Sequence, residues 1–463
     1  MLLPTPHYIL TGMKASRTLL LALLCAVACD LPSSAPVTLD PVSHVPQASE
    51  TVLYEIFVPD FTREGTFSAI IPRLEELRDL GITTLWLMPI HPIGVEKRKG
   101  ALGSPYAVRD YYAVNPAYGT TDSFRELVNA VHEAGMYIMM DFVANHTAWD
   151  HSWTTEHPDW YTPGEDGPLS VPASPDGTPT NWTDVADLNY DSQQLRDEMI
   201  NAMRYWVSEF DIDGYRCDVA EWVPYDFWAD AIRAVRAVKP VLMLAEAGDV
   251  ALHAAGFDMT YAWPFYGTLK AVWEGQSART LGELTIRIER AMPAGTRRLR
   301  FTTNHDETAW DRTPPQIFGG QHGARAASLL AHTMPGVPLL YNGQETGRTA
   351  PVPFFEKTVY DWSAHPEMRA HYTRFFSFHA ESAALREGSF HLLSQSDDIL
   401  AFARETNAEQ VLVIVNVRPR SAVFTLPTTL KGDRLTEIFR DEGYVVGQTL
   451  SLSPYDYRLI RVE

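Results

Sequence analysis

Three apolar, strand-like runs of this chain each end in a carboxylic acid, and this recurrence limits most strongly the folds that the chain can adopt. The three runs end at Asp218, Glu246 and Asp306. A fourth run of the same kind ends at Asn145 and His146. Segments with helical spacing lie between the runs, and polar groups collected at the C-terminal ends of successive strands are typical of the active site of a (β/α)8 barrel.

The segment from residue 211 to residue 220 reads as a short buried strand followed by helical sequence. Side chains alternate along a strand, so Arg216 and Asp218 share one face and Cys217 points toward the helices. A cation on the same face keeps Asp218 ionised and directed, as a carboxylate nucleophile requires. Taken alone, a structural ion pair explains Arg216 and Asp218 equally well.

Four motifs resemble, in their order, the four conserved regions of the α-amylase family of retaining glycoside hydrolases. They are DFVANH at 141–146, DGYRCD at 213–218, AEA at 245–247 and TNHD at 303–306. The resemblance extends from about Thr51 to the end of the chain. It implies that Asp218 is the nucleophile, Glu246 the general acid and base, and Asp306 the acid that orients sugar hydroxyls. The alanines beside Glu246 independently predict a raised carboxyl pKa, because they exclude water.

The same resemblance implies a set of sugar-binding residues around the bond that is cleaved. Tyr106 matches the tyrosine that stacks on the sugar, and His146 and His305 match histidines that hydrogen-bond it, while Arg216 holds the nucleophile. The alternatives are an aromatic side chain that packs in a loop, for Tyr106, and satisfied core histidines.

A structural calcium ion is the one cofactor that the resemblance suggests, and no organic cofactor is expected. Asn145 matches a calcium ligand of the family, and Asp184 and Asp187 are acids that would complete an oxygen-rich site. Many members carry Lys-His shortly after the nucleophile, where this chain has Val219-Ala-Glu-Trp222. Whether calcium binds and which sugar occupies the acceptor side therefore stay open.

The resemblance and the alternation of elements together predict an α/β fold with three parts. A (β/α)8 barrel spans 51–385, a small domain of about 147–190 is inserted after its third strand, and a C-terminal all-β sandwich spans 386–463. The first two strands are expected at 52–58 and 83–88 with one helix at 67–80 between them, and the sixth and eighth strands at 257–261 and 337–342. Of the four tryptophans at 149, 153, 160 and 182, we expect about one to contact a glycan.

The N-terminal residues 1–29 have the basic region, short apolar run and small residues of a secretory signal peptide. The end of this run, Ala26-Val-Ala-Cys29, also resembles a lipoprotein cleavage box, so acylation of Cys29 and plain cleavage near Ala28 both stay open. Residues 30–50 read as a Pro- and Ser-rich linker. We therefore expect an exported protein of the periplasm, cell envelope or medium. Its only membrane contact would be a lipid anchor, if Cys29 is acylated.

The net charge of -20 argues against nucleic acid as a partner, because the chain lacks the basic surface that phosphates need. We expect a monomer that hydrolyses α-1,4 bonds of starch-like polysaccharides or malto-oligosaccharides. The alternatives are a transglycosylase, an α-1,6-glucosidase or a disaccharide-converting enzyme of the same family, and a catalytically silent glycan-binding protein. The three acids argue against the silent protein, since a binder needs neither a nucleophile nor a proton donor.

Overall fold

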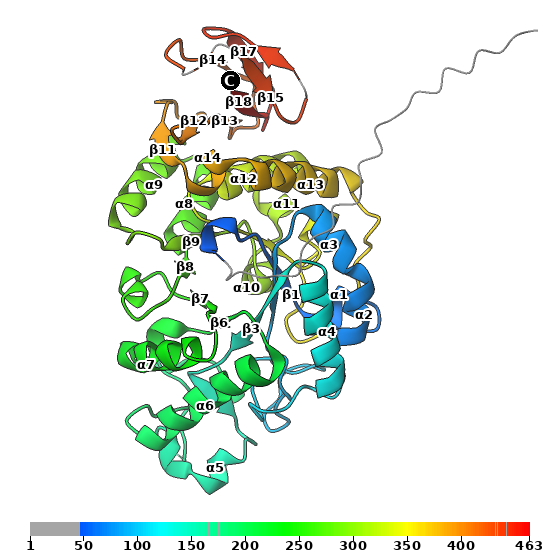
Figure 1. Cartoon of the computed structure of the whole chain (residues 1–463), viewed down its shortest axis with the longest axis vertical. Helices are drawn as coiled ribbons and strands as arrows, with labels where there is room; N and C mark the ends of the chain where they lie inside the picture. The colour runs from blue at the N-terminus through cyan, green and yellow to red at the C-terminus, as the bar shows by residue number, and fades with distance from the viewer. Residues whose placement is uncertain (1–46, 165–166, 175, 431, 433, 441) are drawn as a thin grey trace, which may run out of the picture. The chain divides into compact units, whose positions relative to one another are not determined.

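The structure is a computed structural model that describes residues 47–164, 167–174, 176–430, 432, 434–440 and 442–463. Eight parallel strands close into a barrel in the order β1-β10-β9-β8-β7-β6-β3-β2 (Figure 1). They are β1 (Leu53–Ile56), β2 (Thr84–Leu87), β3 (Tyr137–Phe142), β6 (Gly214–Cys217), β7 (Leu242–Ala245), β8 (Met259–Tyr261), β9 (Arg297–Arg300) and β10 (Val337–Tyr341). The predicted (β/α)8 barrel is confirmed.

The strands are buried on both faces, and this explains why their sequences are nearly continuous apolar runs. Neighbouring residues alternate between two hydrophobic clusters: Leu53 belongs to the smaller one and Tyr54 to the larger one, which the helices share. We assign the smaller cluster to the barrel interior. Cys217 is a free, buried thiol in the larger cluster, so it faces the helices as predicted.

The helices of the described residues surround the barrel (Figure 1). They are α1 (Val58–Phe61), α2 (Phe67–Ile70), α3 (Leu74–Leu80), α4 (Thr121–Glu133), α5 (Trp153–Glu156), α6 (Gln193–Phe210), α7 (Tyr225–Arg236), α8 (Trp263–Trp273), α9 (Arg279–Ala291), α10 (His305–Trp310), α11 (Pro314–Ile317), α12 (Gly320–Thr333), α13 (Pro366–Glu381) and α14 (Ala383–Glu387). Within the described ranges, no helix combines the length and the apolar character that crossing a membrane requires.

The prediction of one continuous helix over 67–80 is wrong, because the structure has two helices there. Helix α2 ends at Ile70, a 3-10 turn covers Ile71–Arg73, and α3 begins at Leu74. The cause is Pro72, which has no amide hydrogen and therefore cannot donate the hydrogen bond that would continue the α-helix. The predicted end of the helix is correct, because Gly81 adopts a left-handed conformation with φ of 96°.

A long excursion follows β3 and contains little regular structure. Strand β4 (His146–Ala148) pairs antiparallel with β5 (Val185–Asp187), and α5 lies between them in sequence. The register places His146 opposite Asp187. This pairing fixes the inserted segment beside the C-terminal end of β3.

The C-terminal part of the chain is all-β, as predicted, and is drawn in orange to red in Figure 1. One sheet has the order β11-β12-β13-β18-β15-β16, and β14 pairs with β17 in a second sheet. The strands are β11 (Ser389–Leu392), β12 (Ile399–Glu405), β13 (Gln410–Asn416), β14 (Ala422–Thr425), β15 (Leu435–Glu437), β16 (Gly443–Tyr444), β17 (Thr449–Leu452) and β18 (Tyr457–Val462). Their inward residues form a separate hydrophobic cluster.

Arg418 joins this β domain to the barrel. Its guanidinium donates to the carbonyl of Gln276 at 2.6 Å and to that of Asp397 at 2.7 Å, and it also bonds the carbonyl of Val272 at the end of α8. Asp398 accepts from its Nε at 3.0 Å. One buried cation therefore ties a barrel helix to two loop residues of the β domain.

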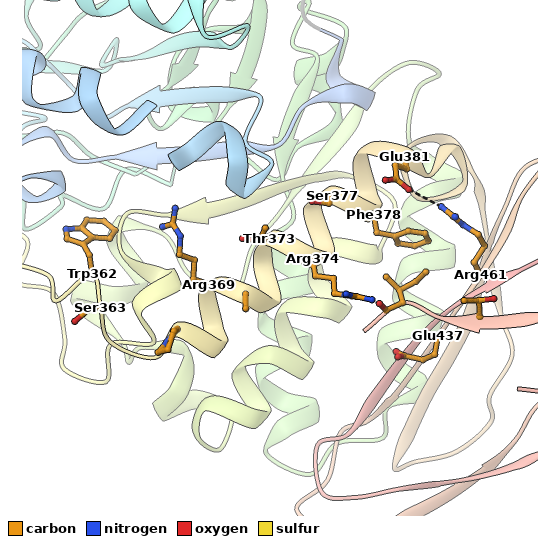
Figure 2. A pocket seen from close by; sticks show the side chains of 14 residues that line it. Trp362, Ser363, Arg369, Thr373, Arg374, Ser377, Phe378, Glu381, Glu437 and Arg461 are labelled. Carbon is orange, nitrogen blue, oxygen red and sulfur yellow. Dashed lines mark hydrogen bonds and ion pairs between the residues drawn. The ribbon is translucent and has the colours of Figure 1, made fainter. Parts of the chain in front are cut away.

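A groove of about 940 Å³ lies between α13 and strands β15 and β18. Figure 2 shows Arg369, Thr373 and Ser377 of α13 along this groove, and the ion pair of 3.5 Å between Arg461 and Glu381. None of the predicted site residues lines it.

Candidate active site

The predicted site residues meet in a second cavity, at the C-terminal end of the barrel strands. This cavity has a volume of about 440 Å³, and all three acids line it together with Tyr106, His146 and His305. Asp218 directly follows β6, Glu246 directly follows β7, and the loop after β9 carries Asp306 at the start of α10. The parallel strands thus bring together residues that are far apart in the sequence.

Arg216 lies beneath the cavity and is the hub of its charges. Its Nη1 donates to Asp218 Oδ1 at 2.8 Å and to Asp141 Oδ1 at 2.9 Å. Its Nη2 lies 2.8 Å from Glu246 Oε2, an ion pair whose direction is unfavourable for a hydrogen bond. Since the Arg216 side chain is fully buried, it holds these three carboxylates in fixed positions.

The backbone after the nucleophile strand also orients Glu246. The Val219 amide donates to Glu246 Oε2 at 2.9 Å. Val219 has φ of 35° and ψ of 47°, a left-handed conformation that is costly for a β-branched residue. The surrounding structure holds this strained residue, and its amide is thereby aimed at the carboxylate.

Burial governs the protonation of the two central acids. Burial raises the pKa of Glu246, Arg216 lowers it, and the charges of Asp218 and Asp306 raise it, so that the pKa is about 7. This is the direction that the sequence predicts. Burial also raises the pKa of Asp218 to about 6, again opposed by Arg216. Because the pKa of Glu246 is the higher of the two, a shared proton favours Glu246 and leaves Asp218 ionised, the arrangement that acid and nucleophile require.

His305 takes part in a buried chain of hydrogen bonds. Its Nδ1 bonds Glu55 Oε1, and its Nε2 lies 2.9 Å from the Tyr106 hydroxyl, which donates to Asp141 Oδ2 at 3.0 Å. Burial alone lowers the pKa of a histidine, but Asp306 and Glu55 raise that of His305 to about 9. A protonated His305 donates from both ring nitrogens, so the chain has one direction from His305 through Tyr106 to Asp141.

Sequence reasoning missed three of these buried groups as parts of the site. They are Glu55 on β1, Asp141 on β3, and Trp86 on β2, whose Nε1 donates to Asp141 Oδ2 at 3.3 Å. The signal for Glu55 was available, because it is a lone carboxylate within the apolar run 52–58. A buried carboxylate needs a partner, but the sequence does not say which residue supplies it.

His146 contrasts with His305, because no carboxylate compensates its burial. The pKa of His146 falls to about 3, so its ring is neutral. Asn145 Nδ2 lies 3.2 Å from its Nδ1, which leaves Nε2 as the protonated nitrogen.

Only one of the four tryptophans singled out from the sequence, Trp182, lines the cavity. Trp153 and Trp160 are buried in the core. Trp149 lies under Lys97, whose Nζ is 3.1 Å from the ring centre.

The residues suggested for calcium are arranged differently from a metal site. Lys99 Nζ lies 2.7 Å from Asp184 Oδ1, so a lysine already neutralises that acid. Burial raises the pKa of Asp187 to about 6, and Asp187 accepts from the Thr162 hydroxyl at 2.6 Å. Across the ranges that the structure describes, no three His, Cys, Asp or Glu side chains cluster as metal ligands. Asn145 bonds His146 and does not line the cavity.

Comparisons with known proteins agree with this geometry. A family model described as the α-amylase catalytic domain matches residues 48–375, and one described as the maltogenic amylase C-terminal domain matches residues 390–459. The chain is 27% identical over 412 residues to α-amylase MalA of Haloarcula japonica, covering 84% of this chain and 58% of that protein. It is 30% identical over 405 residues to an α-1,4-glucan:maltose-1-phosphate maltosyltransferase of Rhodospirillum rubrum, covering 78% of this chain and 55% of that protein.

The chain thus spans a little over half the length of these two relatives. Among solved structures, it is similar to an α-amylase from Lactobacillus plantarum, with a TM-score of 0.80 and 29% identity. That match covers 90% of this chain and 100% of the other.

Proposed function

The chain belongs to the α-amylase family, and from this premise we propose that it is a retaining glycoside hydrolase that cleaves α-1,4-glucosidic bonds in starch-like polysaccharides or malto-oligosaccharides. The observation that carries the proposal is that Asp218 and Glu246 each contact a terminal nitrogen of the Arg216 guanidinium at 2.8 Å. Two carboxylates that share one guanidinium lie close together, as the spacing of about 5 Å in retaining enzymes requires.

The proposed reaction has two steps. In the first, ionised Asp218 attacks the anomeric carbon while protonated Glu246 gives its proton to the leaving glycosidic oxygen, which departs as a hydroxyl. The product is a glycosyl ester on Asp218. In the second step, the Glu246 carboxylate takes a proton from water, whose oxygen attacks the anomeric carbon and releases Asp218. Two inversions give net retention.

The other lining residues are assigned to substrate orientation and charge. Asp306 is assigned to sugar hydroxyls, and Tyr106 presents its ring to the pyranose. The imidazolium of His305 bonds a sugar hydroxyl only if that hydroxyl replaces the Tyr106 hydroxyl at its Nε2. His146 carries its proton on Nε2, which we assign to a sugar hydroxyl. Arg216 opposes the rise in the pKa of Asp218 and contacts three carboxylates, so it acts beneath the sugar.

The direct test is incubation of the purified protein with soluble starch, pullulan and maltose, with an Asp218→Asn variant as control. We expect starch to yield short malto-oligosaccharides of α configuration by NMR, and the variant to yield none. If wild-type protein bound starch but left all three sugars intact, the hydrolase proposal would fail and a silent glycan-binding protein would replace it.

A transglycosylase is the second candidate, because the maltosyltransferase is among the relatives at 30% identity. Transfer differs from hydrolysis only in the acceptor of the second step, which is a sugar hydroxyl in place of water. Incubation with maltotriose separates the two activities, since only transfer yields products longer than the substrate.

Calcium binding at Asn145 stays a prediction of the sequence. Calcium takes six to eight oxygen ligands, whereas Asp184 is paired with Lys99 and Asp187 with Thr162. These residues fit calcium poorly, and no step of the mechanism passes through it.

We further propose that the protein is an exported monomer, with residues 1–29 as signal peptide and Cys29 as the candidate for acylation. What supports export is the signal pattern alone, and these residues lie outside the described ranges. Metabolic labelling with a fatty acid, beside a Cys29→Ser variant, tests the anchor, and light scattering tests the oligomeric state.

A further inference from the structure

Trp310 is unusual among the large hydrophobic side chains because it is exposed and lines the catalytic cavity. Its side chain is 64% exposed, and every other exposed large hydrophobic residue in the described part of the chain is a valine. It ends α10, four residues after Asp306, so the two side chains lie on the same side of this short helix. Exposing an indole to water is costly, and such a ring beside an active site indicates a surface that a ligand covers.

Trp310 is the outer end of a row of aromatic rings that begins inside the cavity. Tyr106 and Phe354 are nearly parallel, with ring centres 6.1 Å apart and an angle of 21°. Phe354 and Trp310 follow at 5.6 Å and 31°. Phe355 supports Trp310 from the side at 5.8 Å and 61°. The loops after β2, β9 and β10 supply these rings, and all four residues line the same cavity.

A second aromatic pair includes one residue of the cavity lining. Trp182, which lines the cavity, stacks on Trp222 with ring centres 5.0 Å apart and an angle of 17°. Trp222 lies three residues after Val219, whose amide bonds the acid Glu246. Because Glu246 gives its proton to the leaving group, we assign the acceptor sugar to the side of Trp182 and Trp222. We assign the row from Tyr106 to Trp310 to the donor chain.

We propose that Trp310, supported by Phe354 and Phe355, is a stacking platform for a glucose unit of the donor chain beyond the sugar that lies on Tyr106. This proposal rests on the proposed function and specifies its substrate as a neutral α-glucan with at least two donor units. Stacking suits such a ligand, because the apolar face of a pyranose is flat and the three aromatic rings carry no charge.

The test uses binding, so that it does not depend on hydrolysis. In a Glu246→Gln background, maltoheptaose and maltose are titrated calorimetrically into proteins with Trp310, Trp310→Ala and Trp310→Phe. We expect Trp310→Ala to weaken maltoheptaose binding by about tenfold, with a smaller effect on maltose, and Trp310→Phe to restore most of the loss. Val359→Ala is the matched control, because Val359 is 65% exposed and does not line the cavity.

Equal affinity of the Trp310 and Trp310→Ala proteins for maltoheptaose would overturn the platform, and so would an equal loss for both ligands. Cleavage of maltopentaose labelled at its reducing end tests the donor side. Removing the platform should favour cleavage nearer to the non-reducing end, and a shift toward the reducing end would overturn the assignment. If the wild-type protein bound maltoheptaose in a Trp310-dependent way but hydrolysed nothing, the hydrolase would fail and the platform would stand.

Discussion

Glu55 is predicted to keep His305 charged at neutral pH, and the variant Glu55→Gln tests this. Buried histidines of this protein without a carboxylate have low pKa values, about 3 for His146 and about 4 for His332. The pKa of His305 is about 9 because Asp306 and Glu55 act on it. The pKa of His305 thus exceeds those of His146 and His332 by about 5 to 6 units. If Asp306 and Glu55 each cause half of this difference, Glu55→Gln lowers the pKa of His305 to ~6. The loss of ~3 units corresponds to ~4 kcal/mol of lost stabilisation of the imidazolium.

The kinetic consequence depends on pH. At pH 5 the variant His305 is still protonated, so its Nε2 still donates to Tyr106. At pH 7.5 it is neutral. If Nδ1 keeps the ring proton and donates it to the amide oxygen at position 55, Nε2 has no proton to donate, and the chain from His305 to Asp141 is broken. We expect kcat/KM of the variant relative to wild type to fall by ~10- to 100-fold at pH 7.5 and by less than ~3-fold at pH 5.

The same change alters the pH dependence of stability. The folded pKa of His305 lies above its ordinary value of 6.5, so its charge stabilises the fold below pH 6.5, and this contribution is lost as the pH rises through 9. In the variant the folded pKa of ~6 no longer lies above the ordinary value of 6.5, so the charge of His305 no longer stabilises the fold. Urea unfolding at pH 6 and pH 9.5 measures the difference.

The assay is initial rates on a chromogenic malto-oligoside at both pH values, with NMR titration of the histidine ring carbons. Glu64→Gln, an exposed glutamate, is the matched control. An equal proportional loss of kcat/KM at pH 5 and pH 7.5, with an unchanged His305 titration, would refute the reasoning.

Three further results are expected. The pH profile of kcat/KM should be bell-shaped, with its maximum between about 6 and about 7, because activity needs ionised Asp218 and protonated Glu246. A flat profile from pH 5 to 8 would contradict these protonation states. A calcium chelator should change the melting temperature by less than ~2 °C, since Lys99 neutralises Asp184, and a larger drop that calcium reverses would establish a metal site. Lys99→Met should destabilise the protein by ~1–2 kcal/mol in chemical denaturation, because the buried Asp184 loses its partner. The loss is modest because Lys99 itself is partly exposed. An unchanged denaturation midpoint would show that the ion pair contributes nothing to stability.

The local sequence was sufficient for the barrel and for the three acids. Most barrel strands are short apolar runs, and Asp218 and Glu246 directly follow two of them. The expected strand that ends at Asp306 is wrong in its bounds, because β9 covers Arg297–Arg300 and Asp306 lies on α10. The break at Pro72 was missed, although the effect of a proline on its helix is local.

The partners of His305 and Asp141 were not readable, because they come from distant parts of the chain, whereas Arg216 lies two residues from its partner Asp218 and was predicted. Glu55 meets His305 across 250 residues, and Tyr106 meets Asp141 from another loop. A sequence shows that a carboxylate lies in an apolar run, but not which charge compensates it, and the pKa of a buried group depends on that partner.

The sequence alone therefore determined the class of fold, the family and the order of the acids along the chain, since these follow from local periodicity and from motifs. Only the tertiary structure decided the protonation of His305, the pairing of Lys99 with Asp184, and the aromatic row from Tyr106 to Trp310. These depend on distances between side chains from different loops, and such distances exist only after the barrel has closed.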